Sequence, residues 1–375
     1  MAGSFQIGTL FGIPVRLHWT FLIVIPLFAY IIGSEIELTT ELIADLFGVA
    51  MPNMDLIASG ITPYVLGTIV ALGLFLGVFI HELAHSLIAR SKGIRINNIT
   101  LLILGGISSM EERIPDPRVE LPMALAGPLM SLALGLISSA VAFVFDASTP
   151  FGGLIFFVFG YLGLLNIILF GFNLLPAFPM DGGRVLRAWL AKRMPLYRAT
   201  RIAADVGKAF AIFFGIVGFI LFNPILIIIA FFIYIGAGQE SQALKYNLLL
   251  QDVTVEDAMS SPVVTVPPDL PVKEAISMMQ SSRHLGFPVV RNGELVGIVT
   301  LSDVHAIPEE DREKIRVEEI MTKDVITLPP TAPLTEALKL ISVKDFGRIP
   351  VVVRGEVRGI VTRSDILRVM ELKET

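Results

Sequence analysis

The sequence contains no cysteine. Disulfide bonds, thiolate metal ligands and a cysteine nucleophile are therefore all excluded, and any metal ion must be held by histidine or carboxylate side chains. Charged residues are also scarce, at 17% of the chain, and the formal net charge is only −5. No cluster of lysine and arginine is interleaved with aromatic residues, which argues against nucleic acid as a partner.

Apolar residues make up 54% of the 375 residues, a share that places the chain in a lipid bilayer. The long uncharged runs stop near Tyr246, and the last third has the composition of an ordinary soluble domain. The predicted fold is therefore a polytopic α-helical membrane domain, residues 1–246, followed by a soluble α/β domain.

A helix needs about 20 mostly apolar residues to cross the hydrocarbon core of a membrane. The sequence offers about six such segments, of which the last two are separated by Asn223-Pro224. We predict a tight turn there because proline lacks a backbone donor, and one kinked helix is the alternative. The predicted spans are Leu17–Gly33, Pro63–Ala89, Leu121–Phe145, Gly153–Leu175, Ala203–Phe222 and Pro224–Gly238.

The connectors between these spans differ in charge. Residues 34–62, 146–152 and 223–224 contain no lysine or arginine, and the opposite connectors are basic. Because an excess of basic residues marks the cytosolic side, both termini and the soluble domain of this multi-pass protein of the cell membrane are predicted to be cytosolic. The basic residues are Arg90, Lys92, Arg95, Arg113, Arg118, Arg184, Arg187, Lys192, Arg193, Arg198 and Arg201.

An H-E-x-x-H motif lies inside the second predicted span, at residues 81–85. His81 and His85 are four residues apart, so they share one face of a helix and can bind a single zinc ion, while Glu82 can reach a water molecule beside it. Three ionisable groups in five residues of a span are costly and typical of function; polar contacts with other helices are the alternative. A catalytic zinc site needs a third protein ligand.

The fourth predicted span ends in a segment with two prolines and two glycines, residues 173–183. Irregular backbone at membrane depth occurs only inside the protein or beside a water-filled cavity. Asp181 lies in this segment, on the same side of the membrane as the two histidines, and is therefore the predicted third ligand. The alternative is that Asp181 caps a helix that begins near Arg184.

The two motifs together, H-E-x-x-H in a span and N-x-x-P-x-x-x-x-D-G about ninety residues later, resemble the site-2 protease family of intramembrane zinc metalloproteases. The resemblance covers residues 1–240 and implies that His81, His85 and Asp181 bind one zinc ion. It also implies that Glu82 is the general base and that Asn173 orients the substrate or stabilises the oxyanion. The segment 96–110 then corresponds to a small sheet whose edge could pair with an unwound transmembrane substrate.

Two other features near the motifs receive structural interpretations. Ala126-Gly127-Pro128 and Ser131 offer small residues in the third span, which favours close helix packing. His18 lies at the start of the first predicted span, where we expect it to be solvated, and we do not assign it as a metal ligand.

The last third of the chain matches itself without gaps at a period of 62 residues, which indicates a duplicated module. Its G-x-x-T-x-S-D segments, residues 297–303 and 359–365, resemble those of a pair of CBS domains, with predicted boundaries 247–308 and 309–375. The resemblance implies that the ribose of an adenine nucleotide is held by the Thr and Asp of each copy; helix capping, in a pair that only dimerises, is the alternative. The nucleotide residues are Thr300, Asp303, Thr362 and Asp365, and the candidate phosphate contacts are Arg291, Arg348 and Arg363.

The sequence thus predicts a zinc metalloendopeptidase that cleaves transmembrane segments of membrane-anchored proteins within the lipid, in regulated intramembrane proteolysis. ATP, ADP or AMP bound to the CBS pair is predicted to regulate it, and the CBS pair is predicted to form a homodimer. The alternatives are a CBS-gated channel or transporter and a catalytically silent scaffold. A transporter would predict repeats among the spans, and we find none in the sequence.

Overall fold

The computed structural model describes residues 3–102, 105–110, 115–344 and 346–374. Arg113, one of the basic connector residues, lies outside this part of the chain. The chain divides into two compact units, residues 1–244 and 245–375, and each is described here by itself.

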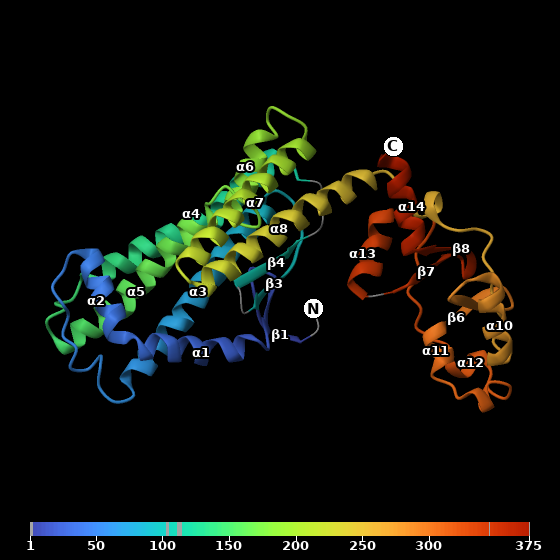
Figure 1. Ribbon diagram of the computed structural model, residues 1–375, viewed down its shortest axis with the longest axis horizontal. Coiled ribbons are helices and arrows are strands. Elements are labelled where there is room, and N and C mark those ends of the chain that lie inside the picture. The colour runs from blue at the N-terminus through green and yellow to red at the C-terminus, as the bar shows by residue number, and fades with distance from the viewer. Residues whose placement is uncertain (1–2, 103–104, 111–114, 345, 375) are drawn as a thin grey trace. The chain divides into compact units, whose positions relative to one another are not determined.

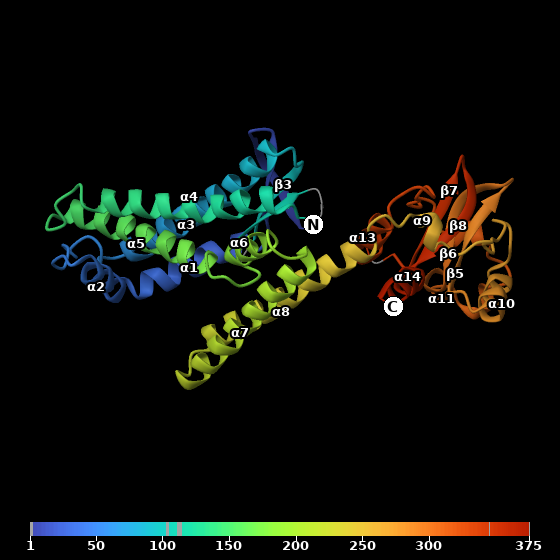
Figure 2. The same ribbon diagram turned by 90° about the horizontal axis from the view of Figure 1, so that it is seen from above.

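The first unit is a helical bundle with one small sheet (Figure 1). Among the described residues, five helices are long and apolar enough to cross a membrane, namely α3, α4, α5, α7 and α8, and the bent pair α1 and α2 could form a sixth span. In both views α3, α4 and α5 lie side by side (Figures 1 and 2). The helices are α1 (Phe21–Ser34), α2 (Ile36–Phe47), α3 (Thr62–Ser91), α4 (Pro117–Ala142), α5 (Pro150–Asn173), α6 (Asp181–Leu190), α7 (Leu196–Ile220) and α8 (Pro224–Leu249).

The predicted first span, Leu17–Gly33, is wrong in its start and in its shape. Residues up to His18 belong to a strand, and α1 has only 14 residues, fewer than the roughly 20 that a spanning helix needs. After Glu35 the chain bends by 74° into α2. The prediction failed because a short apolar run does not distinguish a strand from a helix, and here the residues before α1 find hydrogen-bonding partners in a sheet.

The sheet of the first unit has the order β1-β2-β3-β4, with β1 antiparallel to β2, β2 parallel to β3 and β3 antiparallel to β4. Its last two strands lie in the segment 96–110, where the resemblance implies a small sheet. In this order β4 is an edge strand. The strands are β1 (Ser4–Leu10), β2 (Ile13–His18), β3 (Ile96–Leu102) and β4 (Gly105–Met110).

The break between the last two long helices lies where the sequence predicts a turn. Helix α7 ends at Ile220 and α8 begins at Pro224, and Oδ1 of Asn223 accepts a hydrogen bond from the backbone N–H of Leu226 (3.2 Å). Helix α8 is longer than predicted. It continues without interruption past residue 244, where the first unit ends, to Leu249 in the second.

The second unit has one four-stranded sheet with the order β5-β6-β8-β7, and two hydrophobic cores, one around each copy of the repeat. Equivalent strand pairs have equivalent registers, with Gly286 opposite Thr300 and Arg348 opposite Thr362. The predicted duplication is therefore confirmed as two similar modules. The elements are α9 (Val255–Ala258), α10 (Val272–Ser282), β5 (Gly286–Arg291), β6 (Glu294–Thr300), α11 (Leu301–His305), η1 (Glu309–Asp311), α12 (Val317–Ile320), α13 (Leu334–Lys344), β7 (Arg348–Val353), β8 (Glu356–Thr362) and α14 (Arg363–Glu374).

Candidate metal centre and nucleotide cleft

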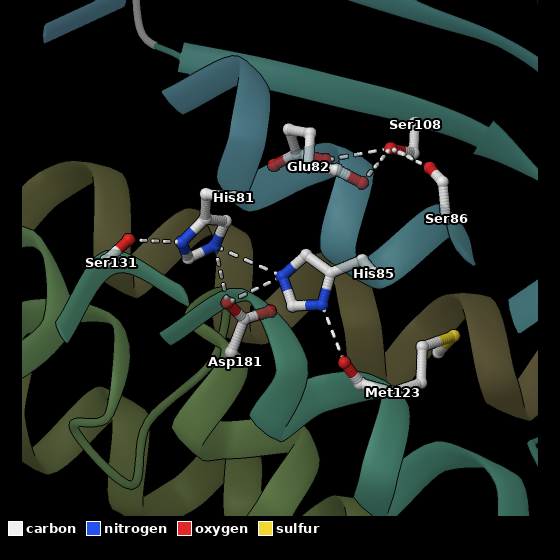
Figure 3. A network of polar contacts seen from close by, with 8 residues as sticks. All are labelled: His81, Glu82, His85, Ser86, Ser108, Met123, Ser131 and Asp181. Atoms are coloured by element: carbon white, nitrogen blue, oxygen red, sulfur yellow. Dashed lines mark hydrogen bonds and ion pairs between the residues drawn. The ribbon is translucent and has the colours of Figure 1, made fainter. Parts of the chain in front are cut away.

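Helix α3 presents both histidines of the motif on one buried face. His81 is 4% exposed and His85 is 7% exposed, and their Nε2 atoms are 3.1 Å apart. Figure 3 shows both rings directed from α3 toward Asp181. The four-residue spacing thus brings the two nitrogens to one point, as the sequence predicts.

Asp181 reaches the same point from α6. Its Oδ2 atom lies 3.1 Å from Nε2 of His81 and 3.1 Å from Nε2 of His85. Helix α6 begins at Asp181 itself, and Met180 occupies the N-cap position. The carboxylate is therefore engaged with the histidines and does not act as the N-cap of α6.

The other nitrogen of each ring is held by α4. Nδ1 of His85 donates to the backbone carbonyl of Met123 (2.7 Å), and Nδ1 of His81 is hydrogen-bonded to Oγ of Ser131 (2.8 Å). Such outer contacts fix the orientation of metal-binding imidazoles. The sequence assigns Ser131 to helix packing. No feature of the sequence indicates that the backbone carbonyl of Met123 contacts His85.

The donor set fits a zinc ion. The Met123 carbonyl can only accept, so Nδ1 of His85 carries a hydrogen, and when the ring is neutral its Nε2 has a lone pair directed at Asp181. A nitrogen and a carboxylate oxygen 3.1 Å apart need either a proton or a metal ion between them. Ligands about 2.0–2.1 Å from one tetrahedral zinc ion stand about 3.3 Å from each other, close to the separations here. The three ligand atoms form the metal-type cluster found among the described residues.

Gly127 of α4 leaves the space that this cluster needs. A Cβ atom at Gly127 would overlap Nε2 of His85 and lie 2.6 Å from Nε2 of His81. Any side chain at this position would therefore occupy the point where the ligands converge. The sequence assigns this glycine to helix packing, and only the structure reveals its place beside the histidines.

Glu82 lies beside the cluster and contacts β4. Oγ of Ser108 donates to Oε2 of Glu82 (2.9 Å), and Oγ of Ser86 lies 3.1 Å from Oγ of Ser108 (Figure 3). The sequence gives no role to either serine.

Two further residues considered at the sequence level lie apart from this network. Asn173 is the last residue of α5, and among the described residues it has no hydrogen bond to the histidines or to Asp181. His18 is hydrogen-bonded through Nδ1 to Oγ1 of Thr20 (2.9 Å) and does not belong to the metal-type cluster.

A buried ion-pair network adjoins α6. Arg187 pairs with Glu120 of α4, each side chain being 4% exposed, and its other terminal nitrogen lies 3.0 Å from Oε1 of Glu240 on α8. The guanidinium also stacks 4.9 Å from the centre of the Phe178 ring. The sequence places Arg187 in a cytosolic connector. Its side chain instead joins three helices, including the one that begins at Asp181.

In the second unit, the predicted ribose-binding residues form two similar but unequal sites. The backbone N–H and Oγ1 of Thr300 both donate to Oδ2 of Asp303 (2.8 Å each), and Thr362 does the same to Asp365 (2.9 and 2.7 Å). In the second copy Oγ of Ser260 also donates to Oδ1 of Asp365 (3.0 Å), which is buried. Asp303 is less buried, and among the described residues its Oδ1 atom has no such partner.

Arg348 connects the two copies. It begins β7 opposite Thr362, and its NH1 atom lies against Gly286, the residue opposite Thr300 in the first copy. Partial burial lowers the pKa of its guanidinium, and among the described residues no carboxylate pairs with it. Of the other candidate cations, Arg291 is ion-paired with Glu318 (2.6 Å), and Arg363 is exposed.

Comparisons with known proteins match both units of the chain to known families. The model of peptidase family M50 matches residues 69–155 and 144–214, and the CBS domain model matches residues 255–308 and 317–372. A zinc metalloprotease of Methanocaldococcus jannaschii is 34% identical over 371 residues, which cover 99% of this chain and 97% of that protein.

A second relative and a solved structure are also similar to this chain. A relative from Synechocystis is 28% identical over 386 residues, covering 99% of this chain and 96% of the relative. The solved structure of a site-2 protease from Methanocaldococcus jannaschii is 34% identical and covers 64% of this chain and 95% of its own, with a TM-score of 0.42.

Proposed function

The chain belongs to peptidase family M50, the site-2 zinc metalloproteases of membranes, with a C-terminal pair of CBS domains, and we propose that it cleaves transmembrane segments of membrane-anchored proteins. The observation that carries this proposal is the convergence of His81, His85 and Asp181 from two helices to within 3.1 Å of one another. The near full-length relatives lend no support to the alternative of a channel or transporter.

The three converging side chains are the proposed zinc ligands. A zinc ion bound there would supply Lewis acidity, which polarises a peptide carbonyl and lowers the pKa of a water molecule. Glu82, one residue after the first ligand, would accept the proton of the attacking water and donate it to the leaving amine. Ser131 and the Met123 carbonyl hold the two imidazoles in the orientation that this chemistry requires.

The substrate is proposed to be a transmembrane helix that unwinds locally, because an intact helix hides its carbonyls in internal hydrogen bonds. The free edge of β4 would pair with the unwound segment, and Asn173, at the end of α5, would orient it. The basic connectors support a cytosolic location for both termini, the CBS pair and the water entrance to the site.

A proteolysis assay with the full chain in detergent tests the proposed function. A membrane-anchored test substrate should be cleaved, a chelator should stop the reaction, and added zinc should restore it. Glu82→Gln should keep the wild-type metal-to-protein ratio and lose cleavage. Cleavage that survives both the chelator and Glu82→Gln would refute the proposed mechanism.

The CBS pair is proposed to bind an adenine nucleotide, ATP, ADP or AMP, with its ribose on the Thr-Asp motifs and its phosphates at Arg348. Two observations support this proposal. Arg348 is a partly buried cation without a carboxylate partner among the described residues, placed between the strand ends that carry Thr300 and Thr362. Oδ1 of Asp303, which accepts no hydrogen bond among the described residues, can accept a ribose hydroxyl, whereas Oδ1 of Asp365 already accepts one from Ser260.

Nucleotide binding is proposed to regulate proteolysis through α8. This helix continues into the second unit, where its Tyr246, and Leu250 just after its end, pack in the core of the second CBS copy. Within the first unit its Glu240 is ion-paired with Arg187 of α6, the helix that begins at Asp181. A displacement of α8 would therefore act on the helix of a proposed metal ligand. Comparing cleavage with and without each nucleotide, in wild type and in Glu240→Gln, tests this route.

The domain boundaries and the oligomeric state are also proposals. Boundaries at 1–246, 247–308 and 309–375 are supported by the division near residue 244 and by the two CBS matches. We also propose that the chain forms a homodimer through the CBS domains. The mass of the purified protein–detergent complex, corrected for bound detergent, tests the dimer.

A further inference from the structure

The general base has a hydrogen-bonding partner on the neighbouring sheet. Oγ of Ser108, on β4, lies 2.9 Å from Oε2 of Glu82 and 3.5 Å from its backbone carbonyl oxygen. Glu82 is on α3, so the contact joins a helix to a strand 26 residues later in the sequence. Neither part of the site-2 protease motif contains Ser108.

The direction of the hydrogen bonds follows from the chemistry of the groups. An ionised carboxylate can only accept, so the hydroxyl of Ser108 donates to Glu82. Its oxygen is then left to accept from Ser86, whose Oγ lies 3.1 Å away and whose residue is 0% exposed. The chain of donors therefore runs from Ser86 to Ser108 to Glu82, and each hydroxyl is fixed by its partner.

Close packing of β4 on Glu82 limits its other conformations. A Cβ atom at Gly106 would overlap Cγ of Glu82 and lie 3.2 Å from Cδ. The backbone of β4 thus lies directly against the stem of the base, and Ser108, two residues later on the same strand, binds its carboxylate. Residues two apart on a strand share one face of the sheet, so both contacts come from the same face of β4.

The same strand has one edge without a strand partner. In the sheet order β1-β2-β3-β4, the strand β4 pairs with β3 alone within the described residues. Its second edge offers backbone donors and acceptors to an extended peptide. The strand that would receive the substrate is therefore the strand that holds the base.

We propose that Ser108 is a positioning residue for Glu82, supported by Ser86, and that it ties the orientation of the base to the position of β4. The inference rests on the proposed proteolytic function of this site. Ser108 contacts neither the candidate zinc ligands nor, through its hydroxyl, the free edge of the strand. Its expected effect is therefore on turnover, with metal binding and substrate binding preserved.

The test compares three variants of the full chain in detergent. Ser108→Ala should lower kcat by about 10- to 100-fold, since a misplaced catalytic group loses that much, and should leave KM and the metal-to-protein ratio unchanged. Ser108→Thr keeps a hydroxyl on a strand-compatible residue and should restore most of kcat. Ser109→Ala is the matched control, because Ser109 is the next residue of β4 and points to the opposite face.

The possible outcomes separate this inference from the proposed function. Wild-type kcat in Ser108→Ala together with an inactive Glu82→Gln would overturn the role of Ser108 and leave the protease intact. A loss confined to KM, or a loss of zinc, would also overturn it, because β4 would then act only in substrate binding or folding. If wild type shows no chelator-sensitive cleavage, both proposals fail together.

Discussion

Gly127 on α4 lies so close to His85 on α3 that there is no room for a methyl group between the glycine and the imidazole. Gly127→Ala places that methyl where Nε2 of His85 now lies. Side chains and helices inside a packed bundle have little room to shift. We therefore expect the imidazole to be displaced and zinc binding to weaken by at least about 10- to 100-fold. Zinc titration of the purified variant by calorimetry measures the loss.

Gly171→Ala on α5 is the control for this substitution. Nothing lies within 4 Å of the Cβ position at Gly171, so the added methyl meets open space and the zinc affinity should match wild type. Since alanine favours a helix over glycine, this control should also not lower stability. Wild-type zinc affinity in Gly127→Ala would mean that the histidines do not form the metal site.

Asp181 provides a second test of the same centre. Asp181→Ala removes the only carboxylate of the three-residue cluster and leaves two imidazoles. We expect the metal-to-protein ratio to fall well below that of wild type after dialysis, and cleavage to be lost with it. Metal analysis by atomic emission, run beside circular dichroism to check helix content, makes the measurement.

Asp181→Asn distinguishes charge from shape at this position. The amide is nearly isosteric with the carboxylate but neutral, so it should also bind zinc less well, while α6 keeps its start at residue 181. A variant that retained the full metal content with alanine or asparagine would show that the third ligand lies elsewhere.

The metal motifs could be predicted from sequence because their information is local. A spacing of four residues on one helix brings His81 and His85 together whatever the rest of the fold does. Asp181 is harder to predict because the alternative of a helix cap is common; in the structure Met180 is the N-cap of α6 and Asp181 contacts His81, and its role as the third ligand stays a prediction. The outer contacts from Ser131, Gly127 and Ser108 could not be predicted, because serine and glycine in a span are usually packing residues.

The error at the first span has a similar cause. The predicted helix begins at Leu17, inside strand β2, and whether residues 13–18 form a strand depends on partners elsewhere, including β3 about eighty residues later. Non-local pairing leaves no mark in the local sequence. In the second unit the repeat itself supplied the missing long-range information, since the two copies must fold alike.

Nucleotide binding should depend unequally on the two aspartates. Asp303→Ala removes the carboxylate whose Oδ1 is free, so Kd for the preferred nucleotide should rise about 10- to 100-fold, the effect of one charge-assisted hydrogen bond. Asp365→Ala should affect stability more than affinity, because that carboxylate holds Ser260 and Thr362. Equal losses of affinity in the two variants would contradict the asymmetry.

Arg348→Ala tests the phosphate contact. The loss should grow from adenosine, where no effect is expected, to AMP and then to ATP, because only phosphates meet the guanidinium. Arg291→Ala is a suitable control, since Arg291 is already paired with Glu318. An Arg348→Ala variant that weakens adenosine and ATP equally would show that the arginine supports the fold of the cleft and not the phosphates.

The ion pair between Arg187 and Glu120 should be a main determinant of stability at the junction of α4, α6 and α8. Arg187→Met keeps the length of the side chain but removes the ion-pair partner of the buried Glu120, which costs about 3–5 kcal/mol. Glu240→Gln should cost less, since its side chain is 30% exposed and the pair with Glu120 remains. The double variant Glu120→Gln, Arg187→Met should recover part of the loss, because no buried charge is left alone.

Lys208→Met, at a more exposed pair with Asp205 (3.8 Å), should change stability by less than about 1 kcal/mol. Unfolding of the purified chain in detergent ranks the four variants. The interpretation fails if Arg187→Met is as stable as Lys208→Met, or if the double variant is less stable than Arg187→Met alone.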